Sequence, residues 1–183
     1  MNRKQKGFSL IELLIVVAII LIIAAIAIPN LLRSKMAANE ASAVGSLRTI
    51  TTAMVTYNST YGVGYAPDLK SLGGPQGVNA SCTASELLDP ILSGTGTGLA
   101  APQKSGYTFN YFAGAVAAAV PTGSTCPPGW ADGYSITAVP INQGTTGQRS
   151  FCTDGSGVIR FDPSGTAPAP AGGLCPTTMN PLQ

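Results

Sequence analysis

Glu12 has the most unusual chemical setting near the start of the chain. From Phe8 to Ile28, only Ser9 and Glu12 are polar. A charged side chain inside a membrane span costs about 3 kcal/mol on insertion scales, and such a residue marks function by default. The competing interpretation places Glu12 in the first turn of a helix. There the helix dipole favours an anion, and the side chain can reach the membrane surface.

A basic leader precedes this segment and ends at Gly7. Its cations are Arg3, Lys4 and Lys6. Cleavage between Gly7 and Phe8 would remove them and leave a new α-amine on Phe8. In lipid, an ion pair between this amine and the Glu12 carboxylate is favoured over either charge alone, because an unpaired buried charge is costly. If the two groups belong to neighbouring copies, the pair also fixes their register.

The other carboxylates offer little catalytic chemistry. The chain has no histidine, so the usual triads and most proton shuttles are absent. No acid forms a recognisable pair with a base or a nucleophile. The carboxylates after the apolar segment and the helix that continues it are Asp68, Glu86, Asp89, Asp132, Asp154 and Asp162. We therefore expect no catalytic residue, no cofactor and no enzyme activity.

Asp154 and Asp162 flank a candidate hairpin and could hold a calcium ion. Calcium normally takes about six or more oxygen ligands, and only two carboxylates can be named here. The alternative is that Asp154 begins a turn and Asp162 caps the end of a strand. We favour this alternative and predict no bound metal.

All four cysteines follow the apolar segment: Cys82, Cys126, Cys152 and Cys175. Beyond the membrane the compartment is oxidising, so two disulfides are expected. Four cysteines allow three pairings, and the sequence does not choose among them. We favour Cys152 with Cys175, which ties the tail to the sheet, and Cys82 with Cys126, which ties down a long loop.

The N-terminal residues resemble a known signature. The run from Lys6 to Leu13 reads Lys-Gly-Phe-Ser-Leu-Ile-Glu-Leu and is similar to the start of type IV pilins and type II secretion pseudopilins. In that family a membrane prepilin peptidase cuts after the glycine and methylates the new N-terminus. The resemblance implies cleavage between Gly7 and Phe8, N-methylation of Phe8, and roles in assembly for Phe8 and Glu12. The proline that ends the family's apolar run corresponds to Pro29.

The sequence also contains a second candidate cleavage site. Ala25-Ile26-Ala27 resembles the small-residue site of ordinary signal peptidase, after a basic start and an apolar core. The apolar core is, however, longer than the usual run of about 7–15 residues. Glu12 also sits where an ordinary signal is apolar. We therefore favour a retained membrane helix over a secreted soluble protein.

The predicted N-terminal helix covers residues 8–61, with a transmembrane half at 8–28. That half is about 31 Å long at about 1.5 Å per residue, enough to cross a bilayer. A single segment in lipid must be helical to satisfy its own backbone. The basic leader favours a cytoplasmic N-terminus. Pro29 lacks a backbone donor, so we predict a kink there.

Residues 30–61 form the predicted amphipathic half of the helix. One face is apolar at helical spacing and should pack on the head. Its residues are Met36, Ala43, Leu47, Ile50, Met54, Tyr57 and Tyr61. The opposite face should meet water or a polar partner. Its residues are Arg33, Ser34, Glu40, Ser42, Arg48 and Thr52.

A globular head is expected at residues 62–162, followed by an irregular Pro- and Gly-rich tail at 163–183. Helical turns are predicted at 66–72 and, from the capping-box pattern of Thr83 and Glu86, at 83–88. The strand patterns cover residues 107–112, 134–141, 149–152 and 158–161, with a hairpin signal at 153–157. Trp130 should be a packed loop anchor, with an exposed contact residue as the alternative.

These elements predict an α+β fold, in which a long helix packs against a small antiparallel sheet. This is also the pilin fold that the resemblance implies. Three of the ten basic residues lie in the leader, which leaves seven against eight acidic residues and a net charge of −1. No basic patch therefore suggests a nucleic-acid partner.

The predicted function is that of a structural subunit of a type IV pilus-like filament. It would wait in the inner membrane, be cut by prepilin peptidase, and assemble with other copies through pilus or secretion machinery. The product would be a cell-surface filament or a periplasmic pseudopilus. The alternatives are a type II secretion pseudopilin and a membrane-anchored periplasmic binding protein.

Overall fold

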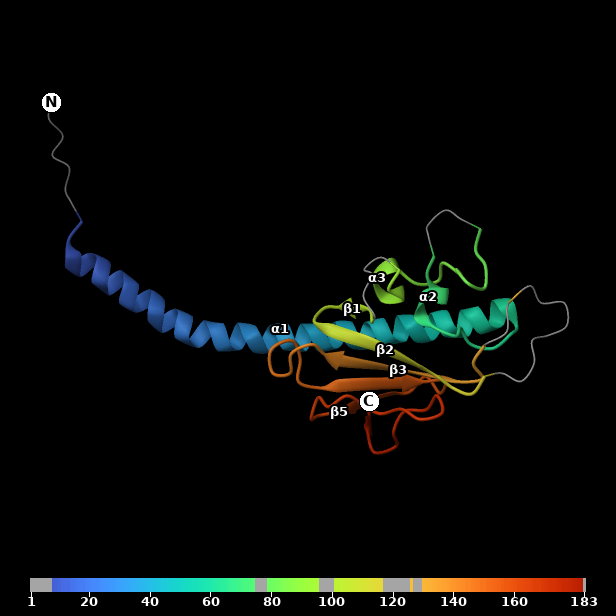
Figure 1. The fold of residues 1–183 in the computed structure, drawn as a ribbon. Coiled ribbons are helices and arrows are strands. Elements are labelled where there is room, and N and C mark those ends of the chain that lie inside the picture. The colour runs from blue at the N-terminus through green and yellow to red at the C-terminus, as the bar shows by residue number, and fades with distance from the viewer. Residues whose placement is uncertain (1–7, 75–78, 96–100, 117–125, 127–129, 183) are drawn as a thin grey trace, which may run out of the picture. The chain divides into compact units, whose positions relative to one another are not determined.

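The structure is a computed structural model that describes residues 8–74, 79–95, 101–116, 126 and 130–182 (Figure 1). The chain divides into two compact units, Met1–Lys35 and Met36–Gln183. The long helix α1, Leu10–Tyr61, contributes to both.

The predicted N-terminal helix is present as α1, a continuous helix of 52 residues. It ends where the chain needs a left-handed residue: Gly62 has φ +64°, and its N–H donates to Asn58 O at 2.9 Å. Glycine adopts this conformation without the Cβ penalty, which explains the end point.

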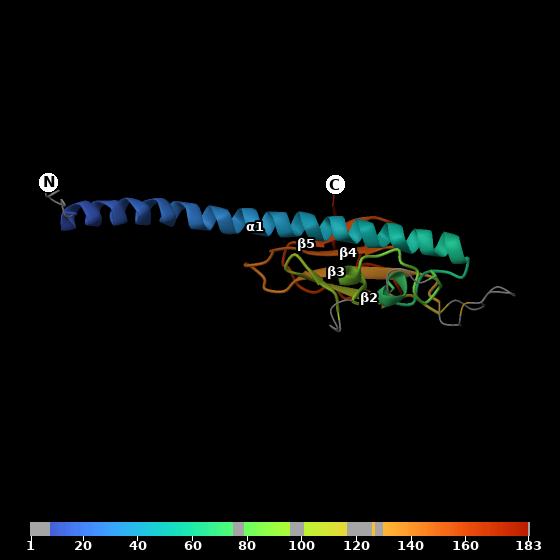
Figure 2. The ribbon, with the colours of Figure 1, turned by 90° about the horizontal axis from the view of Figure 1, so that it is seen from above.

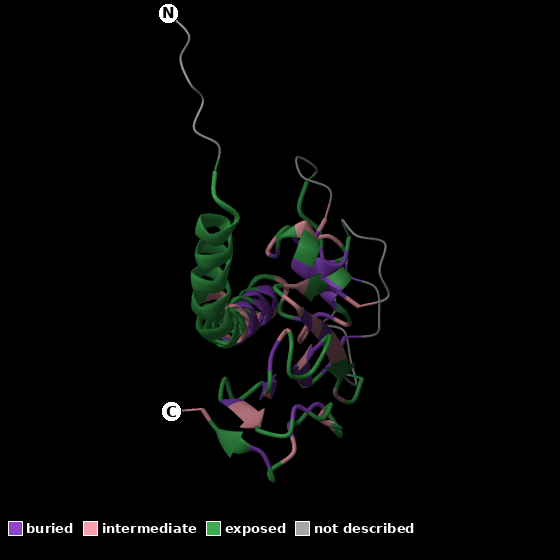
Figure 3. Cartoon of the chain, turned by 90° about the vertical axis from the view of Figure 1, so that its left-hand side faces the viewer, coloured by how far each residue is buried: buried purple, intermediate pink, exposed green. Residues whose placement is uncertain are grey.

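The apolar face predicted for the second half of α1 forms one side of the head core. Ala43, Leu47, Ile50, Met54 and Tyr57 are buried there. The sheet lies along one side of this part of the helix (Figure 2), and the buried side of the helix faces the head (Figure 3). Burial of large apolar side chains against the sheet therefore holds the Met36–Tyr61 part of α1 to the head.

Glu40 lies on the opposite face and meets a polar partner within the head, which is one of the two alternatives predicted for this face. Its residue surface is only 7% exposed, and its carboxylate accepts hydrogen bonds from Gln148 N (2.9 Å), Arg149 N (3.1 Å) and Arg149 Nε (2.8 Å). The Arg149 guanidinium also lies over the rings of Phe151 and Phe161, at 5.5 and 5.4 Å. The loop that follows β3 covers Glu40, and helical periodicity alone cannot reveal such a cover.

Two short helices lie between α1 and the sheet. In α2, Leu69–Leu72, the Asp68 carboxylate caps the first turn by accepting from Ser71 N. In α3, Pro90–Ser93, Asp89 accepts from the backbone N–H groups of Ile91 and Leu92. The predicted helical turn at 66–72 is thus confirmed as a single turn.

The predicted helix at 83–88 is wrong. This segment lies beside α2 and donates to its carbonyls: Ser85 N to Ser71 O, and Leu87 N to Leu72 O. Glu86 adopts a left-handed φ of +54°, which no α-helix contains. The capping-box pattern is local, and long-range hydrogen bonds to α2 took precedence here.

A six-stranded antiparallel sheet forms the other side of the core. Its order follows the chain, from β1 to β6. The strands are β1 Gln103–Lys104, β2 Tyr107–Ala113, β3 Tyr134–Pro140, β4 Ser150–Asp154, β5 Ile159–Asp162 and β6 Asn180–Pro181. The four predicted strands and the hairpin between β4 and β5 are confirmed, with ends shifted by one to two residues.

Trp130 anchors the loop before β3. It is 2% exposed, and its ring centroid lies 5.6 Å from that of Tyr57 on α1. The interpretation as a packed anchor is therefore confirmed over that of an exposed contact residue.

The tail is more ordered than its composition predicted. Its last strand, β6, pairs with β5, and Cys175 and Met179 are buried. The Ser150 hydroxyl of β4 also donates to Thr166 O at 2.7 Å. The tail therefore covers polar residues of the sheet, and the core side of the sheet packs on α1.

Candidate functional site

The N-terminal segment begins with a helix cap formed by the Glu12 side chain. Ser9 precedes α1, and its backbone N–H donates to Glu12 Oε2 at 2.9 Å. Leu13 N donates to Ser9 O at 3.3 Å. Glu12 therefore occupies the N3 position of a capping box, where a carboxylate satisfies an otherwise unpaired helix donor. The Ser9-x-x-Glu12 spacing is the sequence signal for this cap, and the sequence reasoning missed it.

The predicted cleavage bond lies at the edge of the described residues. Gly7 and the leader fall outside them, while Phe8 is the first described residue and is 85% exposed. Phe8 lies one residue before the cap and four before Glu12. Cleavage at Gly7 and methylation of Phe8 remain predictions.

Almost every large apolar side chain of this segment faces outward. Seventeen of them between Phe8 and Leu32 are 46–85% exposed. Full burial of such a side chain contributes about 1.5–3 kcal/mol, so contact with water would cost tens of kcal/mol in sum. The most apolar 18-residue window of α1 has a mean hydropathy of 3.3, and none of that window is buried. By length and composition, this segment can anchor the chain in a membrane.

Pro29 lies inside α1, which the structure assigns as helical on both sides of it. Its missing N–H leaves the carbonyl one turn earlier without its helical donor. The predicted kink at Pro29 remains a prediction.

The head carboxylates have structural roles for the most part. Asp68 and Asp89 cap short helices, and Asp162 accepts from Ser164 N at 2.8 Å. Glu86 and Asp132 are exposed. Within the described ranges, no three residues of the types His, Cys, Asp and Glu gather closely enough to hold a metal ion.

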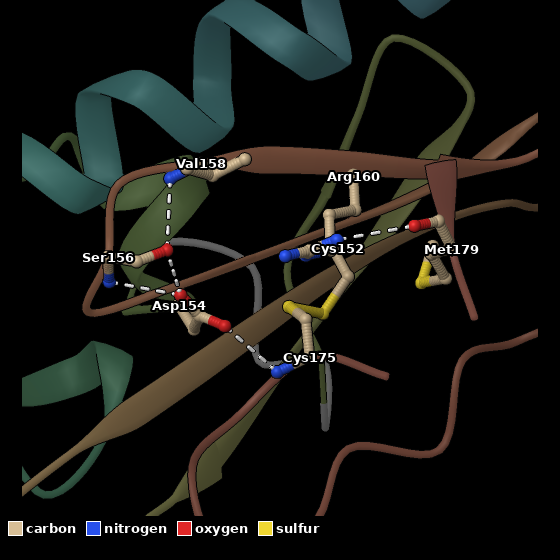
Figure 4. Close-up of a disulfide and its surroundings, with 7 residues drawn as sticks. All are labelled: Cys152, Asp154, Ser156, Val158, Arg160, Cys175 and Met179. Atoms are coloured by element: carbon tan, nitrogen blue, oxygen red, sulfur yellow. Dashed lines mark hydrogen bonds between the residues drawn. A yellow bond between two sulfur atoms is a disulfide. The ribbon is translucent and has the colours of Figure 1, made fainter. Parts of the chain in front are cut away.

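Asp154 links the β4–β5 turn to the tail (Figure 4). One carboxylate oxygen accepts from the Ser156 hydroxyl (2.6 Å) and Ser156 N (3.0 Å), and the other accepts from Cys175 N at 3.0 Å. Burial acts to raise the pKa of Asp154, but these hydrogen bonds and nearby Arg160 hold it below its usual range. Both oxygens are therefore occupied by the protein itself.

Two disulfides stabilise the head. Cys152 on β4 is bonded to Cys175 in the tail, with a Cα–Cα distance of 5.9 Å. Cys82 is bonded to Cys126 with a Cα–Cα distance of 5.8 Å. These are the two pairings that we favoured from the sequence. The Asp154–Cys175 hydrogen bond lies beside the first of them, so covalent and polar contacts fix the tail at the same point (Figure 4).

Comparison with known proteins places the N-terminal segment in a family. Residues 2–28 match the model of the prokaryotic N-terminal methylation motif. A segment of 38 residues is 63% identical to the major component of the type IV wide pilus of Thermus thermophilus, and covers 21% of this chain and 29% of that protein.

Two further relatives show the same partial similarity. The type IV major pilin protein of Myxococcus xanthus is 45% identical over 58 residues, which is 32% of this chain and 26% of the relative. The type II secretion system core protein G of Vibrio cholerae is 40% identical over 62 residues, which is 32% of this chain and 42% of the relative. The chain thus spans less than half the length of each of these relatives. No solved structure matched it.

The prepilin motif, the exposed apolar helix and the α+β head agree with one another. The N-terminal segment of the chain carries the prokaryotic N-terminal methylation motif and is similar to the same segment of type IV pilins and of a type II secretion core protein.

Proposed function

We propose that the chain is a structural subunit of a type IV pilus-like filament and assembles through the apolar part of α1. The observation that carries the proposal is the unbroken exposure of large apolar side chains from Phe8 to Leu32, joined to the N-terminal methylation motif. Such a surface needs a non-aqueous environment at every stage. Lipid supplies it before assembly, and neighbouring copies supply it afterwards.

Small residues in the apolar segment allow it to pack against the same segment of neighbouring copies. The apolar segment includes Ala18, Ala24, Ala25 and Ala27, and small side chains allow helix backbones to approach closely. Moving from lipid into a bundle of sister helices then exchanges one apolar contact for another. The net cost of leaving the membrane is thereby kept low.

Glu12 sets the register in which neighbouring helices align. Its Oε2 accepts from Ser9 N, and within the described part of the chain Oε1 has no hydrogen-bond partner. After cleavage between Gly7 and Phe8, the Phe8 α-amine of a neighbouring copy can donate to Oε1 while the cap stays in place. Because an unpaired charge in apolar surroundings is costly, only registers that align Phe8 with Glu12 are stable.

The partners follow from this scheme. A prepilin peptidase would cut the leader and methylate Phe8, and assembly machinery would extract the subunit from the inner membrane, with its N-terminus on the cytoplasmic side. The contact between copies joins different surfaces and does not close, so it generates a filament. The role is structural and non-catalytic.

A type II secretion pseudopilin is the second candidate, and the similarity to core protein G of Vibrio cholerae favours it. In that case the fibre would be periplasmic. Deletion of the gene distinguishes the two. Loss of surface filaments supports the pilus. A failure of secretion, in which proteins that are normally exported stay inside the cell, supports the pseudopilus. A membrane-anchored binding protein would form neither fibre.

Two substitutions at one position test the assembly role. Glu12→Gln keeps an oxygen that can accept from Ser9 N but removes the charge, whereas Glu12→Ala removes both. We expect both variants to insert in the membrane normally and to form no filaments. Normal filaments from Glu12→Gln would show that Glu12 is only a helix cap.

Mass spectrometry of the mature chain should find methylated Phe8 as the first residue. A first residue at Ile28 would contradict the pilin scheme.

A further inference from the structure

The charged side chains of the Met36–Gln183 unit form two groups. Most have a partner inside the unit. Glu40 pairs with Arg149, Asp89 pairs with Lys104 at 3.6 Å, and Arg160 donates to Met179 O.

Asp68, Asp154 and Asp162 also belong to the first group, because they accept hydrogen bonds in turns and caps. The second group has no such partner. Four charged side chains have no hydrogen bond or ion pair within the described residues: Arg48, Lys70, Glu86 and Asp132. The residues of this unit outside the described ranges carry no charge, so they supply no counter-ion either.

Arg48 stands alone on the exposed face of α1. From Met36 to Tyr61 the helix has only two charged residues, and the other, Glu40, is buried. The hydroxyls beside Arg48 on this face donate to the helix backbone. The hydroxyl donors are Thr49 to Gly45 O, Thr52 to Arg48 O, Thr56 to Thr52 O and Ser59 to Val55 O, at 2.9–3.1 Å.

This face therefore presents threonine methyl groups, hydroxyl oxygens that can only accept further hydrogen bonds, an open glycine and a single cation. A Cβ on Gly45 would have nothing within 4 Å, so another surface can approach the backbone there. The described part of the chain places nothing on this face. The one strong interaction that it can still offer is a contact from the Arg48 guanidinium to an anion.

Glu86 is the best matching anion on the head. It is exposed and holds a left-handed φ of +54°, a conformation that favours glycine or asparagine. Its backbone N–H donates to Gly73 O at 3.1 Å, an interaction that any residue except proline could make. The turn therefore explains the backbone of Glu86 but not its carboxylate.

We propose that the exposed face of α1 around Arg48 binds a second copy of the chain, with Arg48 paired to Glu86 of the neighbour. Charge complementarity supports this occupant, because neither the cation nor the acid has a partner among the described residues of its own chain. They lie on different elements, α1 and the loop between α2 and α3. The contact joins two different patches, which is the geometry that extends into a filament. The inference rests on the proposed filament function.

Charge reversal is the appropriate test, because removing one partner of an exposed ion pair has little effect, whereas like charges in contact repel. In cells that assemble the wild-type filament, Arg48→Glu and Glu86→Arg should each lower the amount of filament sheared from the cell surface at least tenfold. The amount of subunit in the membrane should stay unchanged. The double reversal, Arg48→Glu with Glu86→Arg, should restore them to within twofold of wild type.

Asp132 provides the matched control, as an exposed acid that also has no partner. Arg48→Glu combined with Asp132→Arg should stay defective. Rescue by Asp132→Arg, or normal assembly of either single reversal, would overturn the pairing. Absence of filaments from the wild-type chain would instead defeat the proposed function itself.

A covalent readout keeps the test independent of folding in the double variant. Copies with Arg48→Cys and copies with Glu86→Cys are expressed together, and isolated filaments are oxidised with copper phenanthroline. A disulfide-linked dimer should form only in the mixture and not with either variant alone. No cross-link in intact mixed filaments would contradict the contact.

Discussion

Replacing Glu40 with alanine should destabilise the head strongly, although this residue lies on the face of α1 opposite the apolar stripe. The carboxylate accepts from Gln148 N, Arg149 N and Arg149 Nε, and lies 2.7 Å from Arg149 Nη2. Its side chain is 9% exposed, whereas that of Arg149 is 39% exposed. Glu40→Ala leaves the two backbone donors and the guanidinium without their acceptor.

The magnitude follows from the setting of this pair. Breaking a buried ion pair by removing one partner costs about 3–5 kcal/mol. Because Arg149 is partly solvated, the lower end applies, and we expect about 3 kcal/mol. For a unit of this size each kcal/mol shifts the Tm by about 2–4 °C, so the expected loss is about 6–12 °C. Glu40→Gln keeps one acceptor and should lose about 1–2 kcal/mol.

Trp130 provides the assay. It is the only tryptophan, is 2% exposed, and packs on Tyr57 at 5.6 Å between ring centroids. Its fluorescence should therefore report unfolding of the head in the full chain held in detergent, with disulfides kept oxidised. Denaturant titrations of wild type, Glu40→Ala and Glu40→Gln give the free energies of unfolding.

Arg48→Gln is the matched control, because Arg48 lies on the same helix and has no partner within the described residues. Its free energy of unfolding should stay within about 0.5 kcal/mol of wild type, as is usual for exposed positions. If Glu40→Ala also stayed within that margin, the Glu40–Arg149 contact would have no stabilising role and the reasoning would be refuted.

Two other predictions concern the same unit. Replacing Cys152 and Cys175 with alanine removes a disulfide that joins residues separated by 23 positions. The free energy of unfolding in the Trp130 assay should fall by about 3 kcal/mol, and an unchanged denaturation midpoint would contradict this. The second prediction concerns pH. Burial acts to raise the pKa of Glu40, but its bonds to Gln148 and Arg149 lower it overall, and the pKa of Asp154 is lowered too. Both carboxylates therefore stabilise the head above about pH 4, near their unfolded pKa values, and this contribution should be lost as pH falls through the folded values. Glu40→Gln should flatten that loss, and an equally steep loss would contradict the assignment.

Regular, local features of the fold could be predicted from the sequence. The stripe from Ala43 to Tyr57 repeats at helical spacing and is buried as expected. The alternation at 107–112 and the turn residues at 153–157 predicted a strand and a hairpin that the structure contains. In each case the signal lies within a few residues, where propensity and periodicity operate.

Long-range features could not be predicted in this way. The burial of Glu40 depends on partners 108 and 109 residues away. Residues 83–88 carry a local helix signal but are not helical, because they form hydrogen bonds to α2 instead. Strands β1 and β6 have two residues each, too few for a period to appear.

The candidate site was predictable only in part. The methylation motif, the apolar segment and the charge at Glu12 are visible in the sequence, as is the Ser9-x-x-Glu12 spacing of the cap. The sequence does not show that the charges of Arg48 and Glu86 lack partners, because only the folded head shows which carboxylates and cations are already paired.

An image reconstruction of purified filaments at side-chain resolution tests the central claim most directly. The account predicts that the segments from Phe8 to Leu32 pack against one another inside the filament, with each Glu12 carboxylate within hydrogen-bond distance of the Phe8 α-amine of a neighbouring copy. A filament held together by head contacts alone, with Glu12 unpaired and the apolar segments apart, would contradict it.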